Sequence, residues 1–214
     1  MNRRRILILY YSHTGQTERV LRVIADALRA APHEVDMRRL NPVKDFRFPW
    51  SPLALVGLMV RTYAGAKLSV ELEALPPEVL AGPYDLVIIG HQPWFLTPSV
   101  PVNAFLDGPA SALLRDHKVV SVITTRKQWK RSYRVFEQKV RARGAEVVDS
   151  FVIDDPAPQP MNMVTTVFYL LTGRTLGRGP LKKIFPPVGI SEDGLRQARQ
   201  FGERLSVRLA GGEI

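Results

Sequence analysis

The sequence predicts an α/β domain in which a five-stranded parallel sheet lies between helices. Apolar runs of strand length recur along the chain, and longer segments with helical spacing of apolar residues lie between them. The 214 residues, 45% of them hydrophobic, are enough to bury one core, and neither a linker nor an internal repeat interrupts them. We therefore expect a single domain over residues 1–214.

Five segments are predicted as strands from their apolar patterns. The run at 84–90 is continuously apolar, which is typical of a central strand covered on both faces, whereas the half-polar run at 33–40 suits an edge. The predicted strands, in chain order, are residues 5–11, 33–40, 84–90, 118–124 and 145–153.

Helices are predicted between and after these strands. Apolar residues recur at three and four positions from Val20 to Leu28, which indicates a helix packed on the sheet. Ser191 is a candidate N-cap for the last helix, with Glu192 and Asp193 in its first turn. The predicted helices are 17–30, 102–114, 130–143 and a segment from 191 to about 209.

Two segments remain, at about 41–75 and 154–187. Both mix proline, aromatic and aliphatic residues, a composition that argues against disorder. We expect them to be apolar insertions that form an entrance for a hydrophobic substrate. The alternative is that they cap sheet edges or form a homodimer interface.

Composition excludes several kinds of chemistry. Without cysteine the chain has no disulfide, thiolate nucleophile or Cys-ligated metal, which fits a cytoplasmic protein. Its four histidines are scattered, so we expect no metal site. The apolar runs at 52–60 and 161–171 are shorter than the roughly 20 residues of a membrane-spanning helix. Peripheral attachment to a membrane stays open.

The formal charge of +10 is concentrated at residues 126–143, where Glu137 is the one acid. This basic helix is interpreted as a solvated face, or as a docking surface for an acidic carrier protein or an anionic membrane. Nucleic acid is not expected as a partner, because aromatic residues do not interleave with the basic ones and no DNA-reading motif is present.

Small hydroxyl residues follow the first strand, at the end of the sheet where open parallel sheets bind ligands. Ser12, Thr14 and Thr17 surround Gly15, which permits a tight turn into the helix, so this loop is predicted to hold a phosphate. No lysine follows the glycine and the pattern G-x-G-x-x-G is absent, which favours a mononucleotide. A simple N-cap with a polar turn is the alternative.

Two stretches resemble the flavodoxin-like flavoproteins. ILILYYSHTGQTERVLRVIADAL (6–28) resembles their first strand, FMN-phosphate loop and first helix, and DLVIIGHQPWFLTPSVPVNAFLD (85–107) resembles the second flavin loop of the quinone-reductase branch. The resemblance implies strand order 2-1-3-4-5 and FMN as cofactor. The implied cofactor-binding residues are Ser12, His13, Thr14, Gly15, Gln16, Thr17, Gln92, Pro93, Trp94, Phe95, Thr124, Thr125, Arg126 and Trp129.

Two residues are predicted to act in catalysis. Arg126, or Lys127 beside it, would stabilise negative charge on a reduced flavin, although the stretch TTRKQW lacks the paired glycines of many quinone reductases. His91 directly follows a central strand and would move a proton during ring oxidation. Trp94 or Trp129 would cover one face of the flavin ring.

The stretches at 46–50, 93–106, 122–129 and 185–195 are similar to a bacterial subfamily associated with dialkylresorcinol and aryl-polyene biosynthesis. This similarity implies an FMN-dependent oxidoreductase that acts on a hydrophobic cyclic substrate, either a quinone or a cyclic dione oxidised to a resorcinol. NAD(P)H would serve as a diffusible donor. The alternatives are a flavodoxin-type electron carrier and a protoporphyrinogen-oxidase-like enzyme.

Overall fold

The computed structural model describes residues 3–64, 68–126, 129–154, 161–176 and 189–214. Its centre is a parallel sheet with strand order β2-β1-β3-β6-β7, which confirms the predicted α/β class and, counted along the chain, the order 2-1-3-4-5. The strands are β1 (Arg5–Tyr10), β2 (Glu34–Arg39), β3 (Leu86–His91), β6 (Lys118–Thr125) and β7 (Glu146–Asp154). The half-polar β2 lies at an edge, as its composition predicts.

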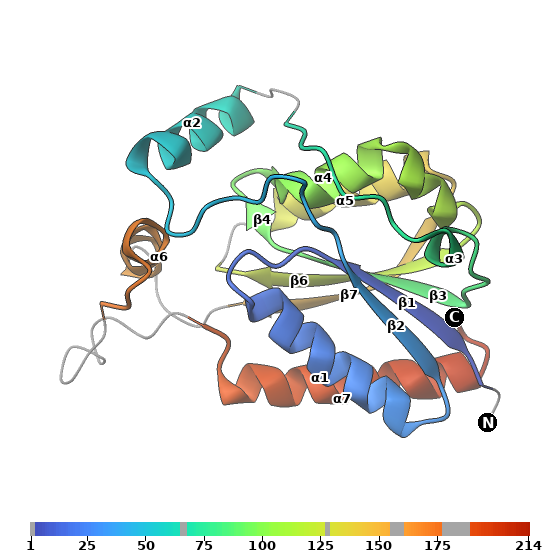
Figure 1. The fold of residues 1–214 in the computed structure, drawn as a ribbon. Helices are drawn as coiled ribbons and strands as arrows, with labels where there is room; N and C mark the ends of the chain where they lie inside the picture. The colour runs from blue at the N-terminus through green and yellow to red at the C-terminus, as the bar shows by residue number, and fades with distance from the viewer. Residues whose placement is uncertain (1–2, 65–67, 127–128, 155–160, 177–188) are drawn as a thin grey trace.

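Helices cover both faces of the sheet (Figure 1). On one face lie α1 (Gln16–Ala30) and α7 (Glu192–Ala210), and on the other lie α4 (Val100–Asp107) and α5 (Lys130–Ala142). Successive residues of β1 point into opposite cores, so that Ile8 packs with the α1 and α7 side and Leu9 with the other. This alternation explains why the central strands are apolar throughout.

The predicted helix at 102–114 is wrong in its extent. The α-helix α4 ends at Asp107, and a separate 3-10 helix, η1 (Pro109–Leu114), follows it. Pro109 cannot donate a backbone hydrogen bond and disfavours a helical conformation in the residue before it. Gly108 is accordingly extended, with φ −85° and ψ 170°.

Helices α1 and α7 approach each other closely at Gly202. A Cβ atom added to this glycine would lie 2.8 Å from Ala27 Cβ and 3.0 Å from the backbone oxygen of Ile24. The glycine therefore lets the two backbones come together on the α1 face of the sheet.

Each insertion contributes one longer helix, α2 (Pro52–Tyr63) in the first and α6 (Met161–Thr172) in the second. Ser51 caps α2, because its Oγ accepts the Ala54 N–H at 3.2 Å. The short helix α3 (Pro77–Leu80) follows the first insertion. Figure 1 shows α2 and α6 together beyond one end of the sheet. Residues 177–187 of the second insertion lie outside the described part of the chain.

The two insertions contact each other. The backbone N–H of Trp50 donates to the Leu170 oxygen at 2.7 Å, and the rings of Phe48 and Tyr169 are 5.2 Å apart.

Of the helices within the described ranges, none has the length and apolarity needed to cross a membrane. In that same part of the chain, no cluster of three or more His, Asp or Glu side chains forms a candidate metal site.

Candidate functional site

A hollow of about 200 Å³ lies at the carboxyl ends of β1, β3 and β6. The strand order reverses direction between β1 and β3, which is where open α/β sheets bind their ligands. Three loops meet there: the first follows β1, the second follows β3 and the third follows β6. Helix α6 and residues 189–190 complete the lining. The lining residues are His13, Thr14, Gln16, Thr17, Gln92, Pro93, Trp94, Thr124, Thr125, Arg126, Thr166, Tyr169, Leu170, Gly189 and Ile190.

The loop after β1 leaves backbone donors available at the start of α1. Gly15 has φ 77°, a left-handed conformation that strains any residue with a side chain. Ser12 Oγ accepts the N–H of Glu18 at 3.3 Å, whereas none of the described residues accepts the N–H of Gln16 or Thr17. Unpaired donors at a helix N-terminus suit an anion such as phosphate.

Side-chain hydrogen bonds hold the three loops together. Thr17 Oγ1 lies 2.7 Å from Thr124 Oγ1 and 2.9 Å from the Gln92 amide. In the orientation that satisfies both ends of this amide, its nitrogen donates to the backbone oxygen of Tyr11 at 2.9 Å and to the Thr17 hydroxyl. Its oxygen accepts the backbone N–H of His13 at 3.2 Å. Thr17 is therefore the point where the phosphate-type loop meets the two other loops.

His13 takes part in a continuous chain of hydrogen bonds. Trp50 Nε1 donates to His13 Nε2, and the Tyr11 hydroxyl donates to Asp45 Oδ1 at 2.8 Å. Since that hydroxyl proton is already committed, the Tyr11 oxygen accepts from His13 Nδ1 at 3.3 Å. All donors are matched only when His13 is neutral with its proton on Nδ1.

The electrostatics of this chain agree with that protonation state. Burial lowers the pKa of His13 below its usual value, and burial together with the Asp45 hydrogen bond raises the pKa of Tyr11. Burial alone would raise the pKa of Asp45, but hydrogen bonds from Arg39 and Tyr11 lower it overall. At neutral pH this series of hydrogen bonds therefore contains the neutral imidazole of His13, the neutral phenol of Tyr11 and the carboxylate of Asp45.

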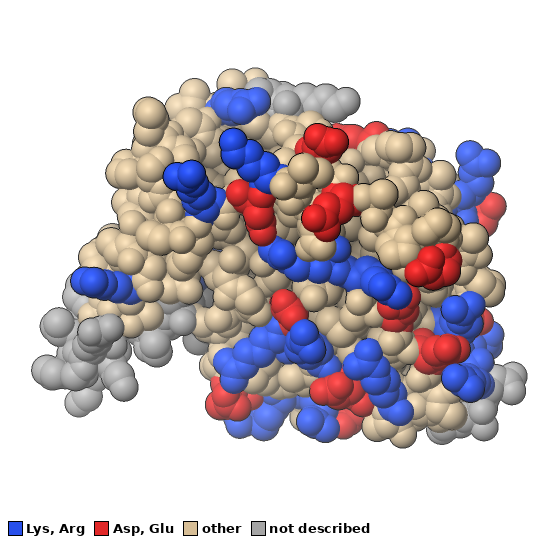
Figure 2. All heavy atoms as spheres, in the orientation of Figure 1, with Lys and Arg blue, Asp and Glu red and all other residues tan. Residues whose placement is uncertain are grey.

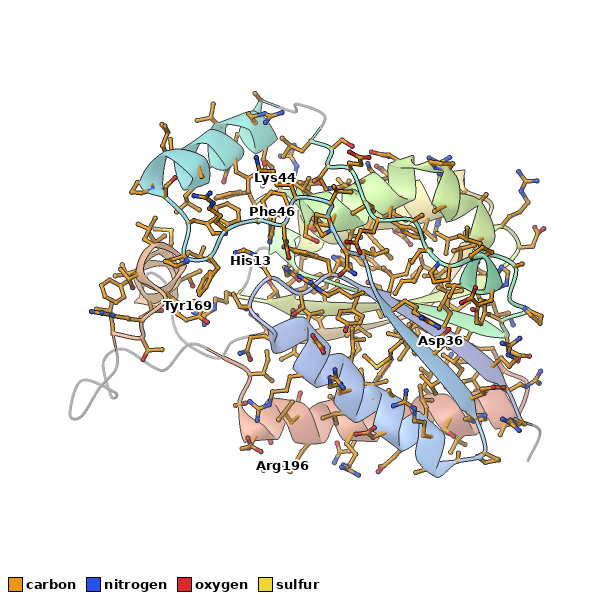
Figure 3. All side chains as sticks on the ribbon, viewed as in Figure 1. His13, Asp36, Lys44, Phe46, Tyr169 and Arg196 are labelled. Carbon is orange, nitrogen blue, oxygen red and sulfur yellow. The ribbon has the colours of Figure 1, made fainter. Side chains whose placement is uncertain are left out.

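Aromatic rings cluster next to the hollow, whose lining includes Trp94 and Tyr169. Trp94 lies edge-on to Phe46 at 4.8 Å and to Trp50 at 5.1 Å. Figure 3 shows His13 between Phe46 and Tyr169, which come from the two insertions. Flat apolar surfaces of this kind suit a planar ring system.

Arg126 connects the third loop to the second insertion. Its guanidinium lies in the lining of the hollow and donates to Thr166 Oγ1 on α6 at 2.9 Å. A cation at this position would favour negative charge on a ring bound in the hollow, and its hydrogen bond attaches α6 to the third loop. Lys127 lies outside the described residues.

Five predicted residues are absent from the lining of the hollow: Ser12 and Gly15, which belong to the loop after β1, and Phe95, Trp129 and His91, which lie elsewhere. Phe95, with φ 59°, faces Tyr63 at a ring distance of 6.4 Å, and Trp129 faces Tyr133 at 6.0 Å. His91 is fully buried on the other side of the sheet, stacked on Phe136 of α5 at 4.6 Å.

Its surroundings also separate His91 from proton transfer in the hollow. His91 Nε2 lies 3.2 Å from Ser121 Oγ, and burial lowers its pKa to about 3. A general base must lie within hydrogen-bond reach of the proton that it takes. His91 is fully buried and does not line the hollow, so it is out of reach of a ligand there. The alternation of side chains along β3 turns His91 toward α5, whereas Gly90 faces α1.

Sequence reasoning expected the insertions to form an entrance to the site, but it did not identify the residues that they contribute. Trp50 and Asp45 bind the His13 chain, and Thr166, Tyr169 and Leu170 line the hollow. The aromatic density of residues 46–50 was a signal for the first group. No local signal marks the second group, because an apolar helix of this composition fits many environments.

The hollow is small for a whole cofactor. Pockets that enclose a drug-sized ligand typically measure about 300–1,000 Å³, and this one has about 200 Å³. A mononucleotide held here would therefore extend beyond the hollow.

Comparison with solved structures finds flavodoxins. Flavodoxin 1 of Bacillus cereus matches 95% of this chain and 97% of its own, with a TM-score of 0.53 and 14% identity. Flavodoxin 2 of the same organism matches with a TM-score of 0.52 and 18% identity, covering 95% of this chain and 99% of its own. An archaeal flavodoxin matches 96% of this chain and 99% of its own, with a TM-score of 0.52 and 10% identity.

At these identities the likeness establishes a flavodoxin-like fold. No family model matches the sequence, and no curated protein matches it.

Proposed function

We propose that the chain binds FMN at the hollow and functions in electron transfer. The phosphate would accept hydrogen bonds from the N–H groups of Gln16 and Thr17 and from the hydroxyl of Thr14. The observation that carries the proposal is the junction of Thr17 with Gln92 and Thr124. It holds the loop predicted to bind phosphate beside the two loops predicted to contact the flavin ring, at the switch point of the sheet.

The other residues of the site have separable roles. Trp94 and Tyr169 would flank the flavin ring, and Arg126 would stabilise negative charge on it. The neutral His13 would hold the loop against the first insertion, since both of its ring nitrogens are already engaged. Bound FMN itself would supply transfer of one or two electrons.

An enzyme acting on a hydrophobic ring is our first choice. Tyr169 and Leu170 of α6 give the hollow an apolar wall that would accept a quinone, a cyclic dione or a porphyrinogen, with NAD(P)H as a diffusible donor. An electron carrier is the second candidate. It is favoured by the fact that nearly the whole chain superposes on flavodoxins from end to end.

The first experiment is a titration of the purified protein with FMN, followed by its visible spectrum and flavin fluorescence. The wild type is expected to bind FMN, and Thr14→Ala/Thr17→Ala is expected to lose affinity while keeping its circular dichroism spectrum. A wild-type protein that leaves FMN fluorescence unchanged at all concentrations would overturn the proposal.

The second experiment separates the two candidates. The FMN-loaded protein is photoreduced without oxygen and mixed with ring acceptors or with a redox protein. Rapid reoxidation by one ring compound supports the enzyme, whereas reoxidation by protein acceptors alone supports the carrier.

A further inference from the structure

Helix α2 presents an apolar stripe to solvent. Leu53, Val56, Val60 and Tyr63 follow one another at spacings of three and four residues, and Leu53 is 84% exposed. The opposite side of the helix is packed, with Leu55 and Leu58 against the core and Thr62 buried. The exposed stripe is therefore the outer face of a folded helix.

Helix α6 is divided in the same way. Its inner side lines the hollow with Tyr169 and Leu170, whereas Met163, Val164 and Val167 are exposed. The backbone N–H of Trp50 joins α6 to the segment before α2, so the two helices that carry these stripes are neighbours at one end of the molecule (Figure 1). The apolar face is defined by Leu53, Val56, Val60, Tyr63, Met163, Val164 and Val167.

The charges around the apolar face are mainly basic, and the nearby Asp45 is paired with Arg39 at 2.7 Å. Residues 46–64 and 161–176 contain Arg47, Arg61 and Arg174 but no Asp or Glu, and all three arginines are exposed. In Figure 2 the surface on the side of α2 and α6 is mostly uncharged, and its charged side chains are mainly but not all basic. Apolar helix faces bordered by arginine are typical of segments that lie in the headgroup region of anionic membranes.

We propose that the apolar face docks on a membrane of anionic lipids. Each helix has 12 residues, too few to span a bilayer, so both would lie along its surface. The arginines would face lipid phosphates while the aliphatic side chains enter the acyl boundary. This inference does not depend on FMN binding.

A second copy of the chain fits this face less well. Two copies placed face to face would bring the arginines of both copies together, and juxtaposed like charges disfavour association. The charge pattern therefore favours lipid over self-association.

The basic helix α5 is also a weaker candidate for lipid. Lys139 is held by Asp107 at 2.7 Å, Arg141 by Glu137 at 2.9 Å, and Arg143 donates to the Leu106 oxygen at 2.7 Å. Its cations are partly committed to neighbouring groups, and α5 exposes no comparable apolar stripe among the described residues.

The test is flotation of the full-length protein with two kinds of vesicle, phosphatidylcholine alone and phosphatidylcholine with about one third phosphatidylglycerol. The wild type is expected to float with the anionic vesicles and to be released by salt. Leu53→Glu/Val60→Glu is expected to weaken this binding by tenfold or more. The matched control is Val207→Glu on α7, because Val207 is also exposed, at 63%, but lies outside the apolar face.

Circular dichroism and thermal unfolding confirm that the variants are folded, and light scattering gives their mass. Three outcomes overturn the proposal. The wild type does not bind anionic vesicles better than neutral ones, or the Leu53 and Val60 changes leave binding intact, or those changes convert a stable dimer to a monomer. The last result would assign the face to a second copy.

Discussion

Trp50, in the first insertion, donates its indole N–H to Nε2 of His13, in the loop that follows β1. This contact decides the protonation state of His13, because a second proton on Nε2 would set two donors against each other. A residue far along the chain thus controls the charge of the predicted phosphate loop. Keeping the imidazole neutral fixes its hydrogen-bond direction through Tyr11 to Asp45.

The first prediction concerns the pKa of His13. Trp50→Phe keeps an aromatic ring but removes the donor, so Nε2 becomes able to accept a proton and the pKa of His13 is expected to rise. Trp94→Phe is the control, since Trp94 contacts His13 through its ring, at 5.7 Å. An NMR titration of the His13 ring proton measures both variants. Equal pKa values in Trp50→Phe and wild type would contradict the assignment.

The second prediction concerns stability in acid. The pKa of His91 is about 3 in the folded protein and about 6.5 in an unfolded chain. Between these values the unfolded chain binds a proton that the folded protein does not, so stability falls as pH falls below about 6.5.

The size of this effect is up to about 1.4 kcal/mol for each pH unit. His91→Gln removes the titrating group, so the free energy of unfolding is expected to depend less steeply on pH between about 6 and 4. Urea unfolding at several pH values measures the slope. An unchanged slope would show that His91 is not the buried titrating group.

The third prediction compares two helical glycines. Gly202→Ala forces a Cβ against Ala27 and the Ile24 backbone, and is expected to lower the free energy of unfolding by about 1–3 kcal/mol. Gly57 in α2 has nothing within 4 Å of an added Cβ, so Gly57→Ala is expected to stabilise by about 0.5–1 kcal/mol. Chemical unfolding measures both, and equal effects would argue against the close approach of α1 and α7.

The fourth prediction concerns the junction of the loops. Thr17→Val removes the hydroxyl that joins Thr124 and Gln92, and loss of about 1 kcal/mol of positioning corresponds to an FMN dissociation constant raised several-fold, up to about tenfold. Thr62→Val is the control, because the Thr62 hydroxyl donates within α2, to the Leu58 oxygen, away from the hollow. Fluorescence titration distinguishes them, and an equal effect of both variants would contradict a specific role for Thr17.

The sheet could be predicted from the sequence because its signals are local. Continuous apolar runs such as β3 identify central strands, and the alternation of Ile8 and Leu9 between two cores follows from the pleat. The break at Gly108 was missed because the apolar pattern continues through it, although Pro109 marks the point.

The site was predictable only in part. The loop from Ser12 to Thr17 carries its own chemistry, so its place at the hollow follows from strand order. The direction of His91 depends on a one-residue register at the end of β3, which composition does not specify. The partners supplied by Trp50 and Tyr169 depend on how the insertions fold back over the sheet, and this is determined by long-range packing.

Trp50 uses two N–H groups for two different attachments, its side chain to His13 and its backbone to Leu170 of α6. Trp50 therefore connects the loop after β1 to both outer helices, α2 and α6. If the protein has two states that differ in the position of Trp50, a ligand and a membrane that both bind the same state more tightly are thermodynamically linked. This linkage is reciprocal. A membrane that strengthens FMN binding by some factor must itself be bound more tightly, by the same factor, once FMN is present.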